Sequence, residues 1–522
     1  MSVELVVRNG TILDGSGGAP FAADVAIEGG RIAAVETLAA VDCAEIDASG
    51  LFVAPGFIDI HSHSDYTLLV DPRAMSAIHQ GVTLEVVGNC GFGCFPIRDA
   101  ELARKAIYGY SDEVPIDWRT AAGYFERLEA SRPAVNVLSL VPNGQLRLST
   151  VGLADRRADP GELAGMTRLL EESLAEGAFG YSTGLEYAQE AGAPEEEVAA
   201  LCRTLARDGG LYATHTRRRD EGATDSVAEA IRVASGSGVR LQVSHLVPRN
   251  GIEEARRSVG LVEDAHARGL DVEFDMHTRT FGLTHLHAAL PPWVLAEDPA
   301  GLAAILRDPA ARERMRPHRS ILSAGGDWGR IVLLDNPFWP DYARRDLASI
   351  AAERGQDALD TVYDLLLAAL SAPHRLMVII HAYSEEEQRE AFAHPLCVPG
   401  SDATTLAPDG ALADTWFHGA YTWAAWFYRF MVRDERLLTP AQAVRKLSRQ
   451  PAARLGLSDR GLVAPGAAAD IAVFDPARFG ERGTTFAPNQ LAEGMVHVLV
   501  NGVHTLRDGR PTGERAGAVL RR

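Results

Sequence analysis

The sequence predicts an α/β fold, a (β/α)8 TIM-like barrel with a small β-sandwich that the N- and C-terminal segments form together. Three observations lead to this prediction: short apolar runs alternate with amphipathic stretches through the middle, both ends show short strands with tight turns, and the chain has 522 residues. Repeated strand–helix alternation is typical of a parallel sheet, and about eight units close such a sheet into a barrel. Such barrels run from about 200 to over 400 residues, which leaves room for attached strands and an insertion.

Both ends of the chain predict antiparallel strands. Residues 4–8 lead into Asn9-Gly10, and residues 496–500 lead into Asn501-Gly502. Asn-Gly between apolar-rich runs is a strong signal for a β-hairpin. The simplest packing brings both ends together, since chain termini often lie close to one another. We therefore expect a division into sandwich segments at 1–54 and 462–522, with the barrel at 55–461.

Strands and helices alternate along the middle of the chain. Amphipathic helices are predicted at residues 160–176, 195–209, 225–236 and 251–269. Predicted strands lie at residues 57–60, 83–87, 136–140, 177–181, 211–215, 240–245, 272–276, 375–380 and 397–401. A long, mostly helical segment that contains prolines interrupts the alternation at residues 285 to about 370. We expect an insertion there, after the sixth barrel strand, in the form of an elaborated loop or a lid.

The composition excludes some classes of binding partner and indicates the cellular compartment of the protein. The formal net charge of −19 argues against nucleic acid and against an anionic membrane surface. No stretch approaches the roughly 20 apolar residues that span a bilayer, and the first residues lack the pattern of a signal peptide. The five cysteines show no disulfide-framework spacing. We expect a reducing, cytoplasmic setting.

The motif His61-Ser62-His63 directly follows the predicted strand at 57–60. Alternation along a strand places residues i and i+2 on the same face, so both imidazoles can point at one spot. Two converging imidazoles form half of a metal site, although a bare His-x-His is equally often a pair of ordinary polar residues.

More residues of this kind stand where other predicted strands end. In a barrel, the reactive groups come from the carboxyl ends of different strands. One cysteine, two further histidines and one aspartate occupy such positions, and they are Cys90, His215, His245 and Asp402. A single strand-end histidine is more often structural, and a free cysteine is often a small buried hydrophobe. Purely structural roles explain a whole set of such residues at equivalent strand ends much less well. Imidazole, thiolate and carboxylate are ligands that suit zinc. Cys94 is a weaker competitor of Cys90, because it lies farther from the strand.

Several motifs are found together at residues 55–65, 80–83, 87–91, 182–185, 212–215, 243–245, 400–402, 451–457 and 470–475. Together they resemble the motifs of the amidohydrolase superfamily, and within it those of the D-aminoacylases (N-acyl-D-amino-acid deacylases). The resemblance covers nearly the whole chain. It implies a zinc-dependent hydrolase of linear amides, foremost N-acyl-D-amino acids, with the terminal segments forming a β-sandwich beside the barrel.

The resemblance also implies roles for individual residues. Cys90, His215 and His245 would hold one tightly bound zinc ion. His61, His63 and Asp402 would complete a second, weaker site that shares Cys90. Asp402 would act as the general base, which accepts a proton from water and passes it to the leaving nitrogen; the ordinary alternative is a turn aspartate after Gly-Ser.

Two other functions compete with this hypothesis. One is a cyclic-amide hydrolase of the hydantoinase or dihydroorotase kind, and the other is a metal-free scaffold of the same fold. Many superfamily members bridge two metals with a carboxylated lysine, but the chain contains only Lys105 and Lys446, both outside the predicted strand ends. A scaffold would have lost ligands, whereas every ligand position is filled here.

The sequence departs from the D-aminoacylase pattern where the substrate carboxylate is expected to bind. The family has an arginine about eleven residues after the catalytic aspartate, and Ala413 stands there. A carboxylate is best recognised by a bidentate guanidinium, which Arg279 could supply from another wall. An exposed or structural arginine is an equally good interpretation of Arg279. The run Arg217-Arg218-Arg219 is typical of a solvated loop.

Overall fold

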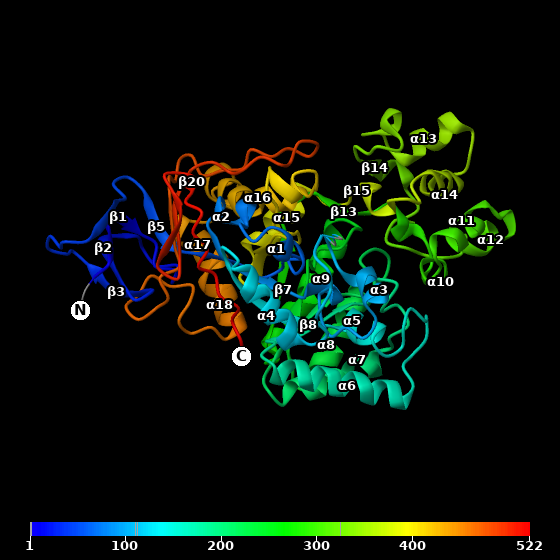
Figure 1. The fold of residues 1–522 in the computed structure, drawn as a ribbon, viewed down its shortest axis with the longest axis horizontal. Coiled ribbons are helices and arrows are strands. Elements are labelled where there is room, and N and C mark those ends of the chain that lie inside the picture. The colour runs from blue at the N-terminus through cyan, green and yellow to red at the C-terminus, as the bar shows by residue number, and fades with distance from the viewer. Residues whose placement is uncertain (1–2, 110, 112, 324) are drawn as a thin grey trace.

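The computed structural model describes residues 3–109, 111, 113–323 and 325–522. Eight parallel strands form one sheet that curls into a nearly closed barrel at the centre of the molecule (Figure 1). Its strands, in chain order, are β6 (Phe57–Asp59), β7 (Val82–Val87), β8 (Asn136–Pro142), β9 (Gly180–Gly184), β10 (Leu211–His215), β11 (Arg240–Val243), β12 (Val272–His277) and β16 (Cys397–Gly400). The predicted fold class is confirmed, and every one of these strands was predicted within a few residues.

The barrel closes where its first and last strands end. The amide of His63 donates to the carbonyl of Ala403 at 2.8 Å, and the amide of Asp402 donates to the carbonyl of His61 at 2.8 Å. Ser62 and Ala403 form a parallel bridge between the two chain segments. Backbone pairing therefore brings the segments around His61 and Asp402 together, although 341 positions separate them in the sequence (402 − 61).

Amphipathic helices cover the outside of the barrel. The four predicted helices are present as α6 (Pro160–Ala175), α7 (Glu195–Ala206), α8 (Ala223–Ser237) and α9 (Ile252–Ala267). The other main helices are α4 (Ala121–Ser131), α15 (Glu385–Ala393), α16 (His418–Tyr428), α17 (Pro440–Leu447) and α18 (Arg449–Leu455), and short ones are α1 (Thr67–Val70), α2 (Met75–Ile78), α3 (Ala100–Ala103) and α5 (Asn143–Leu148). Helix α6 shows why these segments begin where they do. The side chain of Asp159 accepts hydrogen bonds from amides of the first turn, and the side chain of Glu162 accepts one from the amide of Asp159, which together form a capping box.

The two ends of the chain build one sheet beside the barrel. Strand β17 pairs with β5 along residues 471–474 and 52–55, and this pairing joins the N-terminal strands to the C-terminal ones. The nine strands are β1 (Leu5–Ile12), β2 (Phe21–Glu28), β3 (Arg31–Glu36), β4 (Ala44–Asp47), β5 (Phe52–Pro55), β17 (Ile471–Phe474), β18 (Met495–Val500), β19 (Val503–Arg507) and β20 (Arg510–Pro511). In Figure 1 the blue and red segments lie together at one side of the barrel.

Between β12 and β16 the chain leaves the barrel and builds a separate small unit, here called the insertion (residues 281–381). It follows the seventh barrel strand and not, as predicted, the sixth, because the seven strands β6 to β12 all precede it. It contains β13 (Phe281–His285), α10 (Pro292–Leu295), α11 (Pro299–Arg307), α12 (Pro309–Met315), β14 (Ile331–Leu333), α13 (Leu347–Arg354), α14 (Ala358–Ala368) and β15 (Met377–His381). Its apolar side chains, such as Leu306, Ile350 and Leu366, form a core of their own. In Figure 1 the insertion projects from the barrel on the side away from the terminal sheet.

One predicted strand belongs to the insertion and not to the barrel. Residues 375–380, which were predicted in the alternating series, form β15 in an antiparallel sheet with β13 and β14. The run Met377–His381 is apolar because Val378 and Ile379 are buried, as residues of a barrel strand are.

The described helices include none that is both long enough and apolar enough to cross a membrane.

Candidate active site

The residues that the sequence singled out meet at the carboxyl ends of the barrel strands. His61 and His63 follow β6, Cys90 follows β7, and His215 is the last residue of β10. His245 and Asp402 each stand two residues beyond the ends of β11 and β16. Parallel strands in a closed barrel end on one face, so six side chains from five strands reach a common space.

These side chains form two donor groups that share the Cys90 sulfur. In the first group, His61 Nε2 lies 3.2 Å from Cys90 Sγ and 3.6 Å from Asp402 Oδ1, and His63 Nε2 lies 3.3 Å from the same oxygen. In the second group, His245 Nε2 lies 3.5 Å from Cys90 Sγ, and the ring centroids of His215 and His245 are 4.6 Å apart. Within each group, one donor atom from every residue lies within 4.8 Å of the others.

The protonation of His215 suits a ligand of a cation. Burial lowers the pKa of His215 to about 4, so its imidazole is neutral at neutral pH and keeps a lone pair. Its Nε2 bonds to Glu186, while its Nδ1 is buried without a hydrogen-bond partner and is therefore the nitrogen available to a cation. Burial raises the pKa of the Cys90 thiol to about 11 despite the nearby His61. A bound cation would stabilise the thiolate form of Cys90, which the surrounding residues alone do not stabilise.

Two carboxylates orient the histidines from behind. Asp275 accepts a bond from His61 Nδ1–H at 2.9 Å and another from the amide of His245 at 2.8 Å. Glu186 accepts a bond from His215 Nε2–H at 2.8 Å and also pairs with Arg249. A carboxylate behind a ligating histidine fixes its tautomer and ring orientation, so Asp275 and Glu186 prepare the imidazoles to bind a cation.

The backbone at three donors has a conformation that side chains other than glycine seldom adopt. Cys90, His245 and Asp402 have φ angles of 53°, 34° and 44°. Each such residue costs on the order of 1–3 kcal/mol and persists only where its surroundings hold it. Cys90 stands in a turn that needs glycine at its start: a Cβ on Gly88, whose φ is +80°, would lie 2.2 Å from the carbonyl oxygen of Leu140. Strain concentrated at these positions is a mark of a functional site.

Arg279, predicted to bind the substrate carboxylate, is placed differently from that expectation. Its guanidinium donates to Asp402 Oδ2 at 2.9 Å and to the carbonyl of Ser401 at 2.6 Å, and its side chain is 1% exposed. It is not among the residues that line the pocket. The structure therefore places this charge behind Asp402, where it holds the carboxylate toward the histidines.

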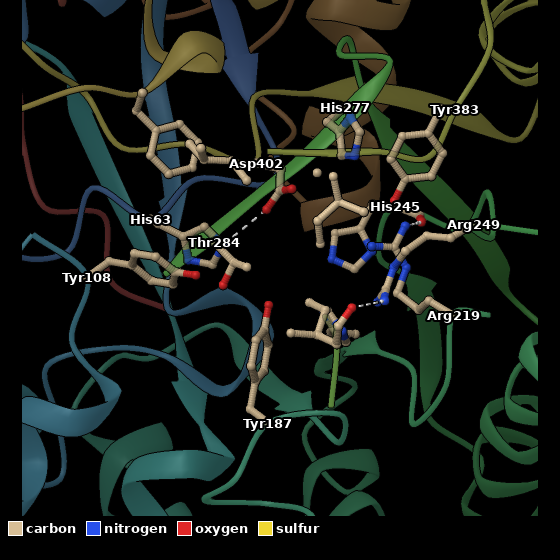
Figure 2. Close-up of a pocket in the computed structure, with 16 residues that line it drawn as sticks. His63, Tyr108, Tyr187, Arg219, His245, Arg249, His277, Thr284, Tyr383 and Asp402 are labelled. Atoms are coloured by element: carbon tan, nitrogen blue, oxygen red, sulfur yellow. Dashed lines mark hydrogen bonds and ion pairs between the residues drawn. The ribbon is translucent and has the colours of Figure 1, made fainter. Parts of the chain in front are cut away.

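A pocket opens beside the donor groups, between the barrel and the insertion (Figure 2). Its lining includes His63, His215, His245 and Asp402. Sequence reasoning missed several other lining residues, among them Tyr108, Tyr187, Arg219, Arg249, His277, Thr284 and Tyr383. Figure 2 shows the two tyrosines Tyr108 and Tyr187 on one side and the two arginines on the other. The nearest signal in the sequence was that Tyr187 and Arg219 follow β9 and β10 by a few residues.

Comparisons with known proteins agree with this geometry. The model of the amidohydrolase family matches residues 44–511. The N-acyl-D-glutamate deacylase of Alcaligenes xylosoxydans xylosoxydans is 33% identical over 100% of this chain and 97% of its own length. A crystal structure of N-acyl-D-glutamate deacylase from Bordetella bronchiseptica, complexed with zinc and a phosphonate mimic of the tetrahedral intermediate, is 30% identical and has a TM-score of 0.81 over all of both chains. A structure of D-aminoacylase with a binuclear metal centre is 30% identical, with a TM-score of 0.82 over all of both chains.

Proposed function

Because the chain belongs to the amidohydrolase family, we propose that it is a zinc-dependent hydrolase of linear amides that cleaves N-acyl-D-amino acids to a carboxylate and a D-amino acid. The observation that carries this proposal is the pair of donor groups that share Cys90 at the mouth of the barrel. The deacylase that contains zinc and a mimic of the tetrahedral intermediate supports the same chemistry.

The residues present fit zinc. Cys90, His215 and His245 would hold the main ion, since thiolate and neutral imidazole are the ligands that zinc prefers. His61, His63 and Asp402, together with the shared sulfur, would hold a second ion. When bound, zinc polarises a scissile carbonyl and lowers the pKa of water to about 7.

Asp402 is the residue best placed to move protons. Burial would raise its pKa, but the hydrogen bond with His63 and the neighbouring charges, including that of Arg279, hold that pKa well below its ordinary value. The carboxylate is therefore ionised and can accept a proton from the attacking water, then deliver it to the leaving nitrogen. Arg279 and His63 bond to it from two sides and fix the direction in which it faces the pocket.

The competing functions predict features that the described side chains do not show. A cyclic-amide hydrolase of the superfamily would bridge its metals with a carboxylated lysine. Lys446 instead donates to the carbonyls of His394 and Cys397, at the opposite end of β16 from Asp402. A metal-free scaffold has no need for the strained backbone at the donors Cys90, His245 and Asp402.

An assay panel tests the proposal directly. We expect the purified protein to contain zinc and to hydrolyse N-acetyl-D-amino acids faster than their L-forms and faster than hydantoins. Hydrolysis of hydantoins alone would support the cyclic-amide function. Protein that lacks zinc after growth with zinc, or that hydrolyses no linear amide, would contradict the proposal.

The carboxylate behind His215 gives a prediction about metal affinity. Glu186→Gln is expected to weaken zinc binding by about 10- to 100-fold, because the partner of a ligating histidine sets its basicity and orientation. Competition with a chromophoric chelator measures this affinity. Glu196→Gln, the same change at an exposed residue of α7, is the control and should leave the affinity unchanged. Equal affinities of the two variants would remove Glu186 from the metal site.

The guanidinium behind Asp402 gives a prediction about pH. Arg279 favours the ionised form of Asp402, so Arg279→Met is expected to raise the pKa of that carboxyl. A base is active above its pKa, so the acid limb of the kcat/KM profile should move to higher pH, and activity should be lost sooner as the pH falls. Arg279→Lys keeps the charge and should stay closer to the wild-type profile. An acid limb that is the same in all three proteins would show that Arg279 does not act on Asp402.

A further inference from the structure

Arg219 is a buried cation on the pocket wall that pairs with no carboxylate. It is 6% exposed and lines the pocket beside His215 and His245. One nitrogen, Nη2, donates to the backbone carbonyls of His245 and Val247, the latter at 3.0 Å. Among the described residues no aspartate or glutamate lies within ion-pair distance of its guanidinium, whose central carbon is 5.9 Å from the ring centroid of Tyr383.

The two other arginines near the centre are already neutralised. Arg249 pairs with Glu186 and donates to the carbonyl of Ile321 at 3.2 Å. Arg279 pairs with Asp402. A buried charge without a partner is strongly unfavourable, whereas a paired one is tolerated. Arg219 is thus the pocket arginine that has no carboxylate within ion-pair distance, since Glu186, whose charge also acts on it, is already paired with Arg249.

The insertion supplies Leu283, Ile321 and Ile380 to the lining, together with Gly282 and Thr284. Phe417, which precedes α16 (His418–Tyr428), adds a further apolar side chain. Phe417 and Ile380 are 7% and 8% exposed. No unpaired lysine or arginine other than Arg219 lines the described pocket. Among the described residues, the pocket therefore offers one arginine for a carboxylate and no second unpaired cationic side chain for a charged substituent.

We propose that Arg219 binds the α-carboxylate of the substrate and that this enzyme selects N-acyl-D-amino acids whose own side chain is uncharged. This inference rests on the proposed function and narrows its substrate class. It also explains how the chain manages with Ala413 where the resemblance implied an arginine, because the guanidinium comes from the loop after β10. A substrate with a second carboxylate, such as an N-acyl-D-glutamate, would leave that charge without a cationic side chain of the described pocket to pair with.

The first test compares substrates on the wild-type, zinc-loaded enzyme. We expect kcat/KM for N-acetyl-D-leucine and N-acetyl-D-phenylalanine to exceed that for N-acetyl-D-aspartate and N-acetyl-D-glutamate by at least about 10-fold, since burying an unpaired charge is unfavourable by more than one decade of binding. A preference for the acidic substrates would overturn the inference and leave the proposed function intact. Hydrolysis of none of the four would refute both.

The second test locates the carboxylate. Arg219→Met should raise KM for N-acetyl-D-leucine by about 10- to 100-fold, the size expected for hydrogen bonds between charged groups, with a much smaller change in kcat. Inhibition by N-acetyl-3-methylbutylamine, which is the same amide without its carboxylate, should be equal in the wild type and the variant. Arg218→Met is the matched control, because Arg218 is the exposed neighbour outside the pocket.

The zinc content of Arg219→Met separates substrate binding from damage to the metal site, because Arg219 also holds the backbone of His245. Full zinc with a raised KM supports the inference. An unchanged KM overturns it, as does an equal loss of affinity for the amide that lacks the carboxylate. Should Arg219→Met not fold, Arg219→Gln gives the same comparison of KM, and the substrate preference of the wild type still tests the selection of uncharged side chains.

Discussion

Replacing Cys90 with alanine is expected to remove zinc and amide hydrolysis together while the barrel stays folded. Both donor groups use this sulfur, so a single substitution removes a ligand from each. The loss of zinc affinity should be larger than the roughly 10- to 100-fold loss that follows when a residue hydrogen-bonded to a metal ligand is replaced. Elemental analysis of the purified variant measures the zinc, and circular dichroism checks the fold.

The chain contains its own control for this experiment. Cys94 is also fully buried and lies four residues away, but it belongs to neither donor group. Cys94→Ala should therefore keep zinc and most of the activity. His245→Ala should behave like Cys90→Ala, because its ring faces the same sulfur at 3.5 Å. A Cys90→Ala protein with full zinc and full turnover would refute the assignment of the ligands.

Asp402→Asn is expected to keep the main zinc ion but to lower turnover by about 10²- to 10⁴-fold, the range that general acid–base catalysis contributes. Asparagine has the same shape and tolerates the left-handed backbone, where Asp402 has a φ of 44°. It can still accept the bond from Arg279, so the geometry survives while the proton acceptor is lost.

Steady-state kinetics with N-acetyl-D-leucine, together with the zinc content, measures this effect. Asp409→Asn is a suitable control, since Asp409 is an exposed acid in the loop that follows Asp402. Turnover of Asp402→Asn within a few-fold of the wild type would show that another group takes the proton. Loss of zinc from the variant would instead make Asp402 an essential ligand of the main ion.

The sequence predicts most of the barrel because each strand and helix carries its own local pattern. The apolar runs that became β7 to β12 and the amphipathic stretches of α6 to α9 are read from neighbouring residues alone. The error at β15 has a physical cause. Apolar periodicity reports that Val378 and Ile379 are buried, but not which sheet buries them, since the core of the insertion imposes the same pattern as the barrel.

The donor residues could be predicted for a different reason. His61, Cys90, His215, His245 and Asp402 each stand at or just beyond a strand end, and the topology of a parallel barrel brings such positions together. This rule predicts where a residue lies, but not the direction in which its side chain points. Arg279 turns back to Asp402, and Arg219 turns inward from a run of charges that is typical of a solvated loop. Only the packing of the surrounding chain decides between these directions.

The pairing of β5 with β17 has a consequence for how the protein is made. Strand β5 is translated near the start of the chain, but its partner at residues 471–474 leaves the ribosome more than 400 residues later (471 − 55 = 416). During nearly all of synthesis the nascent protein therefore carries an open strand edge, which is a template for association with other chains. Aggregation during expression should accordingly depend on this late pairing as well as on the closure of the barrel between the segments around His61 and Asp402, which are also far apart in the sequence.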